Sequence, residues 1–124
     1  MTPQPHSHPV DADGVRLARA GIVSARDAAR LGDLLGLLSD PVRVGMMFCL
    51  AAVDELCVGD LALALDVSTD QSSYALKLLR TAGLVRPRRD GRVIYYSLAD
   101  GFPHQLLDHC LRQLLAIATK EGHS

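Results

Sequence analysis

The fold is decided by residues 54–98, which read DELCVGDLALALDVSTDQSSYALKLLRTAGLVRPRRDGRVIYYSL. Closely spaced leucines, with an acid in the first turn, predict a short helix over 57–65. Ser68 with Gln71 three residues later is typical of a capping box, so a second helix is predicted from there to about Ala82. Two short helices joined by a tight turn are therefore expected.

The end of the same stretch predicts a β-hairpin. Residues 84–89 and 92–98 are both strand-like, and Asp90-Gly91 between them favours a type I′ turn, in which both central residues take positive φ. A helix-turn-helix followed by a hairpin is the plan of a winged helix-turn-helix, with the hairpin as its wing.

Further helices are predicted on both sides of this stretch, because apolar residues recur there at intervals of three and four. We expect them over 15–23, from a Ser24 cap to about Ser39, from Asp40-Pro41 to about Ala52, and after Pro103. The predicted fold class is therefore mostly α with a β-hairpin wing (α+β).

Length and composition indicate one domain, since 124 residues of which 48% are hydrophobic can bury a single core. We divide the chain into a flexible N-terminal arm (1–14), rich in proline and histidine, a winged helix-turn-helix domain (15–120) and a tail (121–124). No apolar run is long enough to span a membrane, and the first residues lack the pattern of a signal peptide. We therefore expect a cytoplasmic protein with reduced cysteines and no membrane partner.

Positive charge is concentrated between Lys77 and Arg92. This segment holds six basic residues and one acid, whereas the remainder holds 7 basic and 13 acidic residues, although the formal net charge is only −1. Such a segment either meets an anionic partner or is a solvated, arginine-rich hairpin.

The combination of this charge with a helix-turn-helix predicts binding to double-stranded DNA. The helix that begins after Ser68 would lie in the major groove, where Gln71 is the best candidate for a base contact because its amide both donates and accepts. The arginines of the hairpin would meet phosphates. The predicted DNA-binding residues are Thr69, Gln71, Ser73, Tyr74, Lys77, Arg86, Arg88, Arg89 and Arg92.

Two other classes of protein do not fit the sequence. It shows no nucleophile, base and orienting residue at usable spacing and no glycine-rich phosphate loop, so an enzyme is not expected. A small metal carrier is not expected either, because the sequence has no CxxC pair and a carrier would not explain the basic segment.

Four segments, LLGLLSDPVRVGMM, DELCVGDLALAL, QSSYALKLLRTAGLV and RRDGRVIYYSL, resemble the ArsR/SmtB family of bacterial metal-responsive repressors in order and spacing, over about residues 30–112. The resemblance implies a homodimer whose first and last helices pair, so that 15–120 serves both DNA binding and dimerisation. It also implies that the metal-free protein occupies operator DNA and that an inducer releases it. The apolar seam of the last helix agrees with a dimer, because no later segment covers it.

The metal sites that this resemblance implies are incomplete here. Phe102, Gln113 and Ala116 stand at ligand positions of the zinc site on the dimer helix. In the family's Cys-x-Cys site, Cys57 is retained and Gly59 replaces the second thiol. Neither ligand set of the family is therefore complete in this sequence.

The remaining candidate metal ligands are Cys57, Cys49, Cys110 and His109. Thiolates select soft ions, so we expect Hg(II) as the inducer, with As(III), Cd(II) or Pb(II) as alternatives. Cys57 is the strongest candidate, because a helix start favours the thiolate and because it matches the family's ligand position. Cys49 and Cys110 lie on apolar stripes, where cysteine is also a common core residue.

Two alternatives stay open from the sequence. A repressor of the same fold could respond to oxidant through a disulfide or persulfide at Cys49, Cys57 or Cys110 instead of through a metal. His6 and His8 could close over the thiol of a partner protomer, or belong to a disordered arm.

Overall fold

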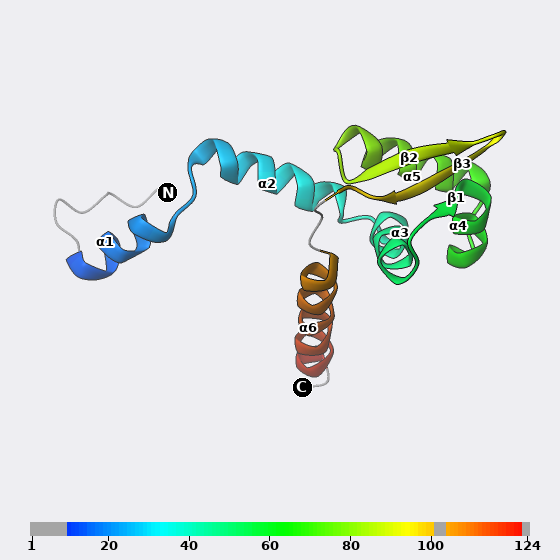
Figure 1. Ribbon diagram of the computed structural model, residues 1–124. Coiled ribbons are helices and arrows are strands. Elements are labelled where there is room, and N and C mark those ends of the chain that lie inside the picture. The colour runs from blue at the N-terminus through cyan, green and yellow to red at the C-terminus, as the bar shows by residue number, and fades with distance from the viewer. Residues whose placement is uncertain (1–9, 101–103, 123–124) are drawn as a thin grey trace. The chain divides into compact units, whose positions relative to one another are not determined.

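The computed structural model describes residues 10–100 and 104–122 (Figure 1). Its elements in chain order are α1 (Ala12–Gly21), α2 (Ala25–Leu37), α3 (Pro41–Ala52), β1 (Leu56–Cys57), α4 (Val58–Leu65), α5 (Thr69–Thr81), β2 (Val85–Asp90), β3 (Val93–Leu98) and α6 (His104–Gly122). The chain divides into two units, residues 1–33 and 34–124. The second unit holds the winged helix-turn-helix that the sequence predicts, and this fold class is confirmed.

The first unit contains α1, which begins earlier than the predicted helix over 15–23. The side chain of Asp11 accepts a hydrogen bond from the amide of Gly14 at 2.9 Å, and this cap starts the helix at the end of the expected arm. Of the expected arm and tail, residues 1–9 and 123–124 lie outside the described residues.

Side-chain caps mark the starts of α3 and α5 in the second unit. Asp40 accepts from the amide of Arg43 at 3.1 Å and starts α3. Ser68 and Gln71 form the predicted capping box of α5, with bonds of 3.0 and 3.1 Å. α4 ends at Leu65, and the next residue, Asp66, takes the left-handed conformation with φ 55°. These bonds join residues three apart, which is why sequence patterns predict them well.

Three antiparallel strands form a sheet in the order β1-β3-β2. The hairpin of β2 and β3 is the predicted wing. β1 was not predicted from the sequence, because it has only two residues and exists through its pairing with β3, in which Leu56 lies opposite Tyr96 and Cys57 lies opposite Tyr95. The candidate ligand Cys57 is therefore attached to the base of the wing.

The tip of the wing corrects the predicted turn. Asp90 is the last residue of β2 and pairs with Val93, so the two-residue loop is Gly91-Arg92 rather than Asp90-Gly91. Gly91 has φ 63°, whereas neither Asp90 nor Arg92 has positive φ. These signs match a type II′ turn, which needs glycine only at its first central position, and the predicted type I′ turn is wrong.

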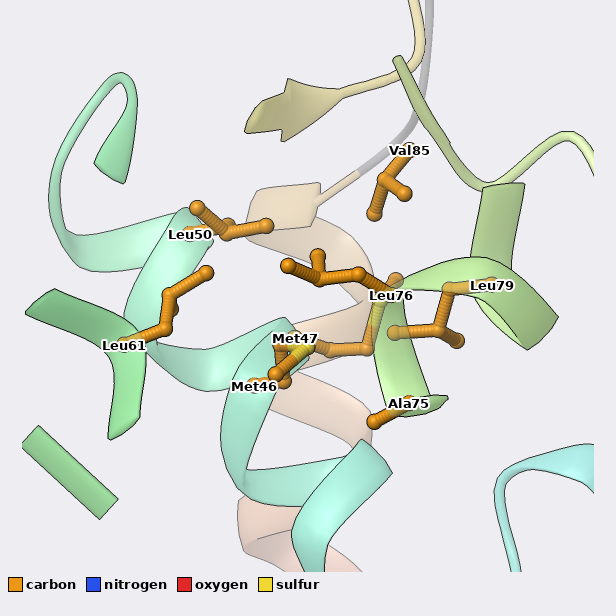
Figure 2. Close-up of a cluster of buried hydrophobic side chains, with 8 residues drawn as sticks. All are labelled: Met46, Met47, Leu50, Leu61, Ala75, Leu76, Leu79 and Val85. Atoms are coloured by element: carbon orange, nitrogen blue, oxygen red, sulfur yellow. The ribbon is translucent and has the colours of Figure 1, made fainter. Parts of the chain in front are cut away.

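One hydrophobic core lies between α3, α4, α5 and the start of β2. Figure 2 shows its eight side chains, Met46, Met47, Leu50, Leu61, Ala75, Leu76, Leu79 and Val85. The buried hydroxyl of Ser72 donates to the carbonyl oxygen of Val58 at 3.0 Å, which ties α5 to the start of α4 without an unpaired polar group.

α2 and α6 contrast with this core. No residue of α2 is buried, and among the side chains of α6 that the structure describes, none is buried either. α6 contacts α3 through Arg112, whose guanidinium lies 4.9 Å from the centre of the Phe48 ring.

Among the described residues no single helix is long and apolar enough to cross a membrane. Only α2 and α3 taken together have the length and composition of a membrane span, and the chain bends by 92° between them.

Candidate nucleic-acid interface

The polar face of α5 points to solvent, as the predicted periodicity requires. The side chains of Ala75, Leu76 and Leu79 are buried against α3 and α4. The opposite face carries the exposed residues Thr69, Asp70, Gln71, Ser73, Tyr74 and Lys77. Packing on one face thus leaves a continuous polar surface on the other, of the kind that a recognition helix presents to a major groove.

The side chain of Gln71 also caps α5, and this limits the predicted base contact. Its Oε1 accepts from the amide of Ser68 at 3.1 Å and from the hydroxyl of Ser68 at 3.3 Å. Bidentate reading of an adenine needs both ends of the amide, so it would open the capping box. Within the described part of the chain, the exposed side chains of Ser73 and Tyr74 make no comparable hydrogen bond.

Two arginines of the wing are held by acids of the same chain. Arg88 donates to both carboxylate oxygens of Glu55, at 3.0 and 2.5 Å, and its guanidinium lies 5.0 Å from the centre of the Tyr95 ring. Arg86 donates to Asp100 at 2.5 Å. We call the Glu55, Arg88 and Tyr95 group the wing clamp. Nothing in the local sequence predicts it, because its two charges are 33 residues apart.

The clamp changes the titration of both its charged groups. The hydrogen bond from Arg88 lowers the pKa of the Glu55 carboxyl below its ordinary value, against a smaller opposing effect of desolvation. The same bond raises the pKa of Arg88. Both groups are therefore charged at neutral pH, and the wing is tied to the segment that precedes Cys57.

The other two predicted arginines lie near the tip of the wing. Arg89 and Arg92 are exposed and form no ion pair with any residue between 10 and 100 or 104 and 122. Their charges are available to a partner, whereas those of Arg86 and Arg88 are already neutralised in part.

A shallow hollow of about 390 Å³ lies beside the polar face of α5, and Tyr96 of β3 completes its lining. Its lining residues are Ser73, Lys77, Arg80, Thr81 and Tyr96, which together we call the basic hollow. Sequence reasoning named Ser73 and Lys77 as DNA contacts and missed Arg80 and Tyr96. The interval of three from Lys77 to Arg80 places both on one helix face and could have indicated Arg80, whereas Tyr96 enters through the tertiary fold.

The cysteines are free thiols in three different environments. Cys49 on α3 is half-buried at the edge of the core, and burial raises the pKa of its thiol. Cys57 is half-buried at the junction of β1 and α4, and its side chain makes no cap bond. Cys110 and its neighbour His109 are exposed on α6.

One chain does not bring the predicted metal ligands into a complete site. Within the residues that the structure describes, no group of three or more histidine, cysteine, aspartate or glutamate side chains is placed to hold a metal ion. His6 and His8 lie outside the described residues.

The chain is similar to known bacterial regulators in both sequence and structure. Residues 40–86 match the family described as "Bacterial regulatory protein, arsR family". The chain is 42% identical over 91 residues to a "Transcriptional repressor SmtB homolog" of Synechocystis, a match that covers 73% of this chain and 68% of the relative. It is 39% identical over 71 residues to a "Cadmium resistance transcriptional regulatory protein CadC homolog" of Staphylococcus aureus, covering 57% of this chain and 59% of the relative.

A solved structure agrees with the fold. The homodimeric winged helix-turn-helix DNA-binding domain of Mb0332 from Mycobacterium bovis, described as a possible ArsR-family transcriptional regulator, matches with a TM-score of 0.62 and 28% identity. The match covers 83% of this chain and 95% of that chain.

Proposed function

Because the chain belongs to the ArsR/SmtB family of bacterial regulatory proteins, we propose that it represses transcription by binding operator DNA as a homodimer and that a thiophilic metal ion releases it. The relatives named above are a transcriptional repressor and a transcriptional regulatory protein, and the chain is a DNA-binding regulator rather than an enzyme. The observation that carries the proposal is the exposed polar face of α5 beside a wing whose tip holds two arginines, Arg89 and Arg92, that pair with no acid among the described residues.

The homodimer is supported by apolar surface that one chain leaves in water. On α2, Leu31 and Leu35 are 52% and 61% exposed, and on α6, Leu114 and Leu115 are 61% and 60% exposed. Contiguous apolar stripes of this kind mark interaction surfaces. Pairing of these helices between two copies would bury them and would present two recognition helices to the two half-sites of an operator.

For the inducer, we favour Hg(II), with As(III), Cd(II) or Pb(II) as alternatives, bound through cysteine. The proposed ligands are Cys57, Cys49, Cys110 and His109. Thiolates prefer soft ions, and a site of two or three sulfurs without a carboxylate partner suits mercury. Because burial raises the pKa of Cys49, metal binding must displace a proton there, so metal affinity should rise with pH.

The wing clamp supports a route from the metal to the DNA. Cys57 pairs with Tyr95, and the ring of Tyr95 lies under the guanidinium of Arg88. Glu55, two residues before Cys57, holds the same guanidinium. An ion that moves Cys57 therefore moves two of the groups that position the wing. For release, the ion must bind the conformation with displaced wings more tightly than the DNA-bound one.

The test is a titration of the reduced protein, bound to DNA from its own upstream region, with each of the four ions. Release at about one equivalent per protomer, together with ultraviolet sulfur-to-metal charge transfer, is the expected result. Cys57→Ser should still bind DNA and should no longer respond. Normal release of Cys57→Ser would contradict the ligand assignment, and release by hydrogen peroxide alone would favour a redox switch instead.

A further inference from the structure

The basic hollow is not explained by base reading. Of its lining residues, Lys77, Arg80 and Thr81 lie in the second half of α5, whereas base contacts come from residues near the start of a recognition helix. The far wall is Tyr96 of β3, a half-buried residue that packs on the core and so is fixed in place. The hollow therefore has one wall on the helix and one on the wing.

Its chemistry fits a single oxyanion. Lys77 and Arg80 are exposed cations, neither forms an ion pair with a described residue, and no acid lines the hollow. The hydroxyl of Thr81 donates to the carbonyl of Lys77 at 2.8 Å and is committed to the helix. Ser73 and Tyr96, which also line the hollow, are residues that carry a hydroxyl group. Two cations and two hydroxyl donors around a small concavity are the groups that bind a phosphate in proteins.

The position of the hollow identifies the source of the phosphate. A helix with its side chains is about 10–12 Å wide and fills a major groove about 12 Å wide. Whatever lies beside such a helix faces the sugar-phosphate backbone at the edge of the groove. The hollow lies along one side of α5, so it would face one of these two edges when α5 lies in the groove.

We propose that the basic hollow receives one backbone phosphate of the bound DNA, held by Lys77 and Arg80 with the hydroxyl of Tyr96 as a further donor. The inference rests on the proposed function and adds Arg80 and Tyr96 to the DNA-contacting residues. A phosphate held between helix and wing sets the register of the protein on the duplex and carries no base sequence of its own.

The first test removes one charge. Arg80→Gln should weaken binding to operator and to unrelated duplex by a similar factor, roughly tenfold. The slope of log affinity against log salt should fall by about 0.9 per protomer, as expected for one lost phosphate contact. Arg16→Gln is the matched control, because Arg16 is an exposed arginine of α1 that pairs with Asp13 at 2.9 Å. Equal behaviour of the two variants would overturn the proposal.

The second test separates a contact from a general loss of charge. Backbone phosphates of the operator are replaced one at a time by neutral methylphosphonates. The wild-type protein should lose affinity at one position per half-site that Arg80→Gln no longer senses, since coupled partners show non-additive effects. Tyr96→Phe should reduce the wild-type loss at the same position.

Two contrary outcomes are distinguishable in this experiment. Full sensitivity of Arg80→Gln at every position would overturn the phosphate assignment and leave DNA binding intact. A wild-type protein that binds no duplex would overturn the proposed function along with this inference. Melting of each variant by circular dichroism shows whether the fold is preserved, which we expect because Arg80 is exposed.

Discussion

The helix-turn-helix core buries its apolar residues within one chain, whereas the two helices that flank it, α2 and α6, expose theirs. Leu61 of α4 and Leu79 of α5 are fully buried within one chain, whereas Leu35 of α2 and Leu115 of α6 are 61% and 60% exposed. The core buries its apolar residues within one chain, while the flanking helices would gain most of their burial from the partner of the proposed dimer. If that proposal is correct, folding and assembly depend on different residues and can be disturbed separately.

The largest effect is expected in the core. Leu61→Ala removes a fully buried side chain and should lower the free energy of unfolding by about 2–5 kcal/mol. Leu63→Ala is its control on the same helix, because Leu63 is 81% exposed, and it should change the free energy by less than about 0.5 kcal/mol. Urea unfolding followed by circular dichroism measures both. Similar losses in the two variants would show that α4 does not pack as described.

The next effect concerns assembly. Leu115→Glu on α6 should weaken the dimer at least about 100-fold, because it removes the burial of a leucine and places a charge in an apolar contact. Leu63→Glu serves as the control. Sedimentation equilibrium should give a monomer for the first variant and a dimer for the second, with both cores still folded. An unchanged dimer of Leu115→Glu would remove α6 from the interface.

A smaller effect distinguishes the arginines of the wing. Arg89→Gln should weaken DNA binding roughly tenfold and lower the salt slope by about 0.9 per protomer. Arg88→Gln should cost less affinity, because Arg88 must leave Glu55 before it can reach a phosphate. Fluorescence anisotropy at several salt concentrations measures both. Equal losses would mean that the wing clamp does not restrain Arg88.

The smallest effect is the pH dependence of the clamp. Arg88 lowers the pKa of Glu55 in the folded state, so the ionised carboxylate stabilises the fold above the ordinary carboxyl pKa, and this contribution is lost as pH falls through the lowered value. Glu55→Gln should therefore reduce the urea midpoint at neutral pH and have little effect in strong acid. In an Arg88→Gln background the substitution should have no such pH-dependent effect. A difference that persists in acid would contradict the clamp.

Local rules were enough to predict most of the fold. The caps at Asp40 and Ser68 act within one helical turn. The apolar spacing that buries Leu76 and Leu79 can be read directly from the sequence. The two-residue strand β1 escaped prediction because its pairing with β3 comes from the tertiary fold. The turn at Gly91 was assigned the wrong type, since strand register decided which two residues form the loop.

The interface was predictable only where it depends on one helix. The outward face of α5 follows from the burial of its other face. The capping pattern in the sequence predicts the hydrogen bond between Gln71 and Ser68. This bond competes with the base contact that the sequence also predicts for Gln71. The wing clamp and the basic hollow join residues that are far apart in sequence, such as Glu55 and Arg88. No local sequence pattern predicts such contacts.

The decisive experiment is sedimentation velocity of fluorescently labelled operator with the reduced protein, before and after one equivalent of Hg(II) per protomer. We expect a complex of two protomers on the DNA, which Hg(II) converts to free DNA while the protein stays dimeric. A complex that keeps its mass in the presence of the metal, or one that holds a single protomer, would contradict this expectation.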